Sequence, residues 1–293
     1  KIFADLKPKF QNPRSPWTPK IPSLSSSRQP PRTLSNPPPS TQTKVNKQQK
    51  KHKKKMKFTE SPVIELTIRD KRISLFQDNA SMHVGTSVWP CSLVLAKFAE
   101  RWAPPPSSSA APSSPYYSSL LDFRGKRGIE LGTGCGGAGM ALHLLGLTDI
   151  VLTDIPAVLP ALRHNLKRNK PVLGRTLRMG TLYWNNLAQV ESFGGPFDFV
   201  VAADVVYIKE GVPHLIAAME ALVKDDGVVL LGYQVRCPEA DKVFWEMSEK
   251  VFAIEKVPKE DLHPEYAYEE SDVYVFRNKK KDEETEAIVS AGE

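Results

Sequence analysis

Short apolar segments alternate with helix-length segments along the second half of the chain, and this alternation restricts the possible folds more than any other feature. Residues 127–131 (RGIEL) and 149–154 (DIVLTD) have the length of buried strands, and residues 137–146 between them fit a helix that ends at a glycine. The same order of strand and helix continues as far as residue 235. Such alternation predicts an α/β fold with right-handed crossovers, and therefore a mostly parallel sheet with helices on both faces.

The alternating region belongs to a predicted domain that spans residues 58–278. Residues 62–68 and 72–78 fit two strands joined by a polar turn, which predicts a β-hairpin extension in front of the sheet. A helix is expected to begin after Pro90. Residues 103–119 are rich in Pro and Ser, and we expect them to be an insertion without regular structure.

Two charged tails flank the predicted domain. Residues 1–57 contain fifteen Lys and Arg but one acid, so they carry about +14, whereas the rest of the chain has 25 basic and 32 acidic residues and carries −7. Too few apolar residues occur in 1–57 to offset the entropy of ordering, which predicts a disordered basic tail. Nucleic acid is therefore expected to bind, if at all, through this tail only. Residues 279–293 form a second charged tail.

Several features of composition bear on the compartment. The acid-poor tail fits an organelle transit peptide, its Lys cluster at residues 50–57 fits a nuclear signal, and a solvated tail with neither role fits as well. Three widely spaced cysteines predict neither a disulfide framework nor a metal site, so a reducing compartment is expected. No apolar run approaches the ~18 residues of a membrane span. We expect the cytoplasm, with the nucleus or an organelle as alternatives.

A glycine-rich segment, IELGTGCGGAG at residues 129–139, follows the first buried strand. Gly132, Gly134 and Gly137 fit the pattern G-x-G-x-x-G, in which a tight turn lets a ligand lie against the backbone at a helix N-terminus. Asp154 ends the next strand about twenty residues later, where a carboxylate accepts hydrogen bonds from both ribose hydroxyls of an adenosine. The alternatives are a glycine-rich turn without a ligand, and an N-cap role for Asp154.

Two classes of cofactor fit this loop, a dinucleotide and S-adenosylmethionine. Glu130 places a carboxylate at the end of the first strand, where it would repel a pyrophosphate but accept donors from the amino-acid part of S-adenosylmethionine. Its alternative role is to bind neighbouring backbone amides. About 120 residues of one α/β domain follow the loop, with no second domain for a substrate, which also favours S-adenosylmethionine.

Five segments in this order resemble the seven-strand, S-adenosylmethionine-dependent methyltransferases of the methyltransferase-like, lysine methyltransferase family 16 group. They are VGTSVWPCSLVLAKF, IELGTGCGGAG, VLTDIPAVLPALRHN, LYWNN and FDFVVAADVVY. The resemblance covers roughly Phe58 to Arg277 apart from the insertion. It implies a Rossmann-like, seven-stranded sheet with an antiparallel last strand, S-adenosylmethionine as the cofactor, and a protein lysine as the methyl acceptor.

The resemblance also implies which residues act. The cofactor-binding positions of the family correspond to Trp89, Gly132, Thr133, Gly134, Asp154, Trp184 and Ala203. The family's DxxY motif falls on Asp204 to Tyr207, so Asp204 and Tyr207 are the predicted catalytic residues. The segment Cys135 to Ala138 departs from the usual loop, which has a large apolar residue there.

The residues themselves support these roles to different degrees. Asp204 stands at the carboxyl end of a predicted parallel strand, where such sheets bind their ligands, and Tyr207 follows on the same side of the turn. We expect Asp204 to attract and orient the lysine ammonium and Tyr207 to align it, while the amine must lose its proton before transfer. Trp89 and Trp184 either enclose the cofactor or simply pack beside the core.

Three alternatives remain open from sequence. The same glycine loop serves NAD-dependent oxidoreductases. A methyltransferase-like binding module without activity would use its basic tail to recruit a partner. A methyltransferase with this site would also suit a small molecule or a different side chain. Of these, methylation of a protein lysine by a monomeric enzyme is the preferred prediction, with no metal required.

Overall fold

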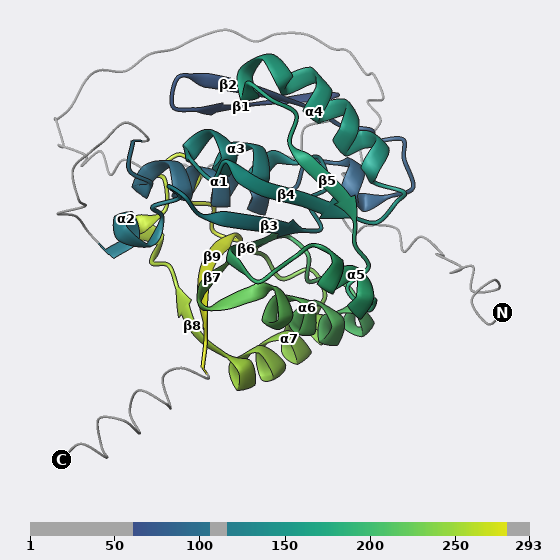
Figure 1. Ribbon diagram of the computed structural model, residues 1–293, viewed down its shortest axis with the longest axis vertical. Helices are drawn as coiled ribbons and strands as arrows, with labels where there is room; N and C mark the ends of the chain where they lie inside the picture. The colour runs from purple at the N-terminus through teal and green to yellow at the C-terminus, as the bar shows by residue number, and fades with distance from the viewer. Residues whose placement is uncertain (1–60, 106–115, 280–293) are drawn as a thin grey trace, which may run out of the picture. The chain divides into compact units, whose positions relative to one another are not determined.

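The computed structural model describes residues 61–105 and 116–279 (Figure 1). The predicted basic tail, most of the Pro/Ser-rich insertion and all but the first residue of the C-terminal tail lie outside these residues, so those predictions stay predictions. Among the described residues, no helix is both long and apolar enough to cross a membrane.

A seven-stranded sheet has the strand order β5-β4-β3-β6-β7-β9-β8. Its strands are β3 (Arg127–Leu131), β4 (Asp149–Asp154), β5 (Arg178–Thr181), β6 (Phe197–Ala203), β7 (Val223–Tyr233), β8 (Phe252–Lys256) and β9 (Asp272–Asn278). The five strands from β5 to β7 are parallel, whereas β9 is antiparallel to both of its neighbours. The predicted mostly parallel sheet with an antiparallel last strand is confirmed.

Helices cover both faces of the sheet, as predicted (Figure 1). One face carries α1 (Pro90–Trp102), α3 (Gly137–Leu145) and α4 (Leu159–Leu173), and the other carries α5 (Leu187–Ser192), α6 (Val212–Leu222) and α7 (Pro238–Val251). Each face buries its own apolar cluster. Along β6 the side chains alternate between them, since Phe199 and Val201 belong to the first cluster and Val200 and Ala202 to the second.

The predicted hairpin extension is also present, as the antiparallel strands β1 (Val63–Ile68) and β2 (Lys71–Phe76). Two buried asparagines of α4 bind the free edge of β2 in the manner of a further strand. Asn169 accepts from the backbone N–H of Ser74 (2.8 Å) and donates to its carbonyl (2.9 Å), and Asn165 does the same at Phe76 (2.8 and 3.1 Å). The hairpin is thereby attached to the helix that follows β4.

Three local features do not follow from composition or periodicity alone. Tyr116–Leu120 form the short helix α2, although we expected residues 103–119 to lack structure; Tyr117 is buried against Phe98 and Trp102, and this packing overrides the loop-like composition. Pro160 lies in the first turn of α4, where its missing N–H has no helical partner to lose. β7 begins at Val223, before the apolar run of residues 227–235.

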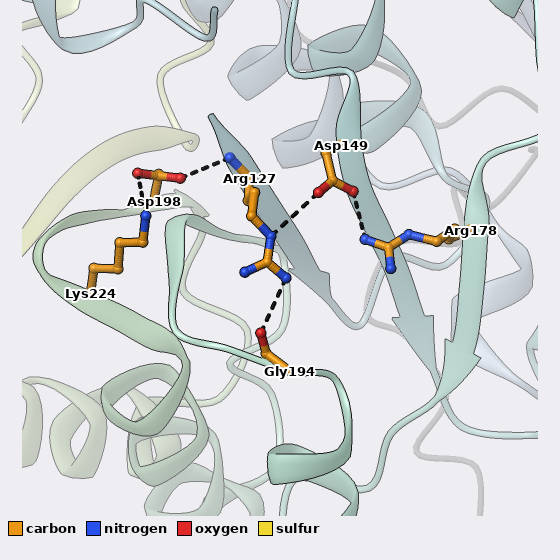
Figure 2. A network of polar contacts seen from close by, with 6 residues as sticks. All are labelled: Arg127, Asp149, Arg178, Gly194, Asp198 and Lys224. Carbon is orange, nitrogen blue, oxygen red and sulfur yellow. Dashed lines mark hydrogen bonds and ion pairs between the residues drawn. The ribbon is translucent and has the colours of Figure 1, made fainter. Parts of the chain in front are cut away.

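The amino ends of the parallel strands are joined by a network of charged side chains (Figure 2). Asp198 accepts from the backbone N–H of Arg127 (2.8 Å) and from Lys224 (2.9 Å). Asp149 accepts from the side chains of Arg127 (3.3 Å) and Arg178 (2.6 Å). These contacts link β3, β4, β5, β6 and β7 at the edge opposite to the glycine loop.

Candidate active site

The loop between β3 and α3 has the backbone that its glycines allow. Gly132, Gly134 and Gly136 have φ values of 64°, 55° and 84°, in the left-handed region that side chains disfavour. A Cβ on Gly132 would lie 2.9 Å from a methyl of Val205, and one on Gly134 would lie 2.9 Å from the carbonyl oxygen of Gly85. The third left-handed residue is thus Gly136, because Gly137 of the sequence pattern already begins α3.

Asp154, at the end of β4, holds this loop from the side. Its Oδ2 accepts from the backbone N–H of Gly134 (2.8 Å) and its Oδ1 accepts from that of Ile155 (2.8 Å). Burial raises the pKa of this carboxyl, and the two backbone hydrogen bonds oppose the rise. The N-cap of α4 is Val158, so Asp154 does not cap that helix, and its carboxylate lies at the loop instead.

Glu130 points beneath α3 and is 1 % exposed. Its Oε2 accepts from the hydroxyl of Thr133 and from the backbone N–H of Gly139 (3.1 Å). Burial raises its pKa to about 8. A Cβ on Gly139 would overlap Leu152 and this carboxylate, so the glycine is what admits the buried acid. The arrangement matches the alternative role considered for Glu130, a carboxylate bound by its neighbours.

Two tryptophans and two small residues complete the predicted cofactor-binding set. The ring of Trp184 lies against Gly132, 3.3 Å from the position that its Cβ would take. The Trp89 indole N–H donates to the carbonyl of Val84 (2.8 Å) in the segment before α1. Thr133 is buried and its N–H donates to Thr153 (3.0 Å). Ala203 is the last residue of β6, the neighbour of β3.

Asp204 follows β6 directly and has an unusual environment. Its φ is 63°, and its N–H donates to the carbonyl of Gly232 on β7 (2.9 Å). Both carboxylate oxygens accept from the guanidinium of Arg236, from Nε to Oδ1 at 2.7 Å and from Nη2 to Oδ2 at 2.6 Å. The Asp204 side chain is 2 % exposed. The anion that we expected to meet the substrate therefore already has a partner.

Arg236 is not among the site residues that the sequence predicts. This residue lies three positions beyond β7, at the same edge of the sheet as Asp154 and Asp204, and its guanidinium carbon is 4.8 Å from the centre of the Trp89 ring. The position just beyond a parallel strand was the available signal. Tyr207, by contrast, is 40 % exposed at this edge, and burial together with the charge of Asp154 raises its pKa, so its phenol is neutral.

The carboxyl ends of β3, β4 and β6 thus bring together a glycine loop, an acid beside it and a second acid after the third strand. In an open parallel sheet this is where nucleotide-like ligands bind, beside the strand at which the order reverses. The fold and the site define an enzyme of the Rossmann-like methyltransferase class.

Comparisons with known proteins agree. A family model described as lysine methyltransferase matches residues 68–251. Protein N-lysine methyltransferase METTL21A of Danio rerio is 30% identical over 224 residues, which cover 76% of this chain and 89% of that protein. The Mus musculus protein of the same name is 28% identical, over 69% of this chain and 85% of its own length. EEF1A lysine methyltransferase 3 of Mus musculus is 29% identical, over 69% and 75%.

The chain belongs to the lysine methyltransferase family. It is an S-adenosylmethionine-dependent enzyme that methylates lysine in protein, and the oxidoreductase alternative has no support. The described residues fit this cofactor, because the glycine loop has the left-handed backbone of a tight turn and the carboxylate of Asp154 lies beside it at the end of β4.

Proposed function

We propose that methyl transfer takes place at the carboxyl edge of β3, β4 and β6, with the nucleoside over the glycine loop and the substrate lysine entering beside Tyr207. The observation that carries this proposal is the hydrogen bond between Asp154 and the N–H of Gly134 (2.8 Å), which unites the acid and the loop in one site. S-adenosylmethionine supplies a methyl group bonded to a positively charged sulfur. Asp154 would bind the ribose, and Trp184 would cover the nucleoside at Gly132.

The protein must also present the lysine in the reactive form. A lysine side chain has a pKa of about 10.4 in water, so only a small fraction is neutral at pH 7. Transfer to the neutral amine needs the nitrogen, the methyl carbon and the sulfur in line, and positioning of this kind is a large source of rate acceleration. Tyr207 would align the amine through its neutral hydroxyl, and the proton leaves to water.

The surroundings of the site suit a protein substrate rather than a free amine. Large apolar side chains are exposed on the segments that lead into the site or leave its strands: Met82, Val84, Ile155, Tyr183, Tyr207, Ile208 and Val235. Exposed apolar side chains on segments beside a polar site favour contact with a protein surface. We infer a substrate whose lysine is flanked by apolar residues. Because one mouse relative is named for EEF1A, purified EEF1A is the first substrate to test.

The test uses the full chain, labelled S-adenosylmethionine, and either purified EEF1A or a cell lysate. We expect label in a protein band, and mass spectrometry should place it on a lysine side chain. Asp154→Ala is the matched control and should transfer little label at low cofactor concentration. Label on a small molecule or on another type of side chain would contradict the proposed acceptor.

A further inference from the structure

Arg236 and Asp204 form a buried ion pair just beyond the carboxyl ends of β6 and β7. The two parallel hydrogen bonds, 2.7 and 2.6 Å long, occupy both carboxylate oxygens, and the side chains are 22% and 2% exposed, respectively. Pairs of this geometry are stronger and more directional than single contacts on a surface. A buried carboxylate that loses its partner is strongly unfavourable. The pair therefore occupies both carboxylate oxygens of Asp204 and does not leave them available to a second cation.

Within residues 61–105 and 116–279, the groups that most affect the charge of Arg236 come from two segments. Its guanidinium stacks on Trp89, at the N-cap of α1, which places the cation at the border of the predicted cofactor site. The titratable groups of the described chain that shift its pKa most are Asp204 and, from α1, Cys91. Burial, followed by the charge of Asp204, raises the pKa of the Cys91 thiol well above its ordinary value, so the thiol is neutral. One cation and one anion remain, and their charges cancel.

This cancellation matters for the chemistry of lysine. An unpaired carboxylate within ~4–6 Å of an amine raises the pKa of that amine by about 1–3 units. It would hold the substrate as an ammonium ion, which has no lone pair to attack the methyl carbon. A carboxylate that already binds a guanidinium exerts little net attraction on a second cation, while its position still shapes the site.

We propose that Arg236 is a positioning residue that acts through Asp204, and that the ion pair lets the site take the substrate lysine as a neutral amine. The inference rests on the proposed function. In the transfer, the amine lone pair forms the nitrogen–carbon bond while the carbon–sulfur bond breaks and its electrons stay on sulfur. The methylated nitrogen then loses its proton to water.

The experiment measures the charge preference of the site with two nucleosides. Sinefungin has a carbon that bears a primary amine in place of the sulfur that bears the methyl group in S-adenosylmethionine, and S-adenosylhomocysteine is uncharged at that position. Isothermal titration with the full chain at pH 8 gives the ratio of their affinities. We expect Arg236→Gln to raise this ratio in favour of sinefungin by about tenfold, because Asp204 then attracts the protonated amine.

Three further variants test the contribution of each charge to the ratio. Asp204→Asn leaves the guanidinium alone and should lower the ratio by a similar factor. The double variant Asp204→Asn/Arg236→Gln removes both charges and should return it to within about twofold of the unmodified protein. Arg236→Lys keeps the positive charge and should also stay within about twofold. Any structural damage common to both nucleosides cancels in the ratio.

The proposal would be overturned if Arg236→Gln left the ratio of the two affinities unchanged while the variant melted at the normal temperature. If that variant does not fold, Asp204→Asn decides, and an unchanged ratio there has the same meaning. Neither measurement needs a methyl acceptor. The role of Arg236 is therefore decided separately from the proposed methyl acceptor, which the labelling experiment tests.

Discussion

At the scale of single residues, Asp154 is the side chain whose loss should affect the cofactor most. Its two carboxylate oxygens bind the loop at Gly134 and the chain at Ile155, and the predicted ribose contact uses the same group. Asp154→Ala should weaken S-adenosylmethionine binding by about 10- to 100-fold, since a hydrogen bond to a charged group contributes about 1.5–3 kcal/mol. Isothermal titration measures this. Affinity equal to that of the unmodified chain would exclude the ribose assignment.

Glu130 should make stability depend on pH in an unusual direction. Its pKa is about 8 in the folded protein and ordinary in the unfolded chain, so the folded state holds an additional proton between these values. The free energy of unfolding should therefore fall as the pH rises from about 4.5 to about 8. Urea unfolding should show that Glu130→Gln, which stays neutral, lacks this part of the fall. Parallel stability curves for the two proteins would show that Glu130 does not titrate in this range.

At the scale of elements, the hairpin is a separate two-stranded sheet, and its strand β2 is bound by α4. Asn169 satisfies both backbone groups of Ser74, so its replacement leaves an N–H and a carbonyl of β2 without their partner. Asn169→Ala should lower the free energy of unfolding by about 1–3 kcal/mol. Lys167→Ala, at an exposed position of the same helix, is the control and should change it by less than about 0.5 kcal/mol. Urea titration of both variants measures the difference.

The alternation of strand and helix made most elements predictable, and the exceptions have physical causes. Tyr116 to Leu120 became a helix because Tyr117 packs on distant residues, a contact that local composition does not reveal. β7 begins as early as Val223 because Val223 pairs with Phe197 of β6. Asp225 and Asp226, which lie between Val223 and the apolar part of the strand, are exposed and polar. Apolar periodicity therefore located the centre of this strand but missed its beginning.

The candidate site was predictable where its residues follow strands in short motifs. The glycine loop, Asp154 and Asp204 each stand beside a recognisable strand end. Arg236 could not be predicted in this way. Its role in the site depends on an ion pair with a residue 32 positions earlier and on stacking against Trp89. Basic residues that follow a strand are common in sequences. Only the packing of three separate segments gives Arg236 a specific partner.

At the scale of the whole molecule, the two ends of the parallel strands differ in function. The carboxyl edge holds the site, whereas the amino edge holds the network of Figure 2, in which Asp198 joins β3, β6 and β7. Burial of the Asp198 carboxyl opposes ionisation, but the Arg127 N–H and Lys224 outweigh it, so its pKa is lowered. A carboxyl with a lowered pKa stabilises the fold above its unfolded pKa, and this contribution disappears as the pH falls through the folded value.

Asp198→Asn should therefore destabilise the protein without disturbing the cofactor site. We expect the free energy of unfolding at pH 7 to fall by about 1–3 kcal/mol, because hydrogen bonds to a charged group are weakened. The difference from the unmodified chain should shrink as the pH falls below about 4, where the unmodified carboxylate is protonated as well. Asp226→Asn, at an exposed position of β7, is the control. S-adenosylmethionine affinity should stay within about twofold in both variants; a larger loss in Asp198→Asn alone would show that the amino edge also shapes the site.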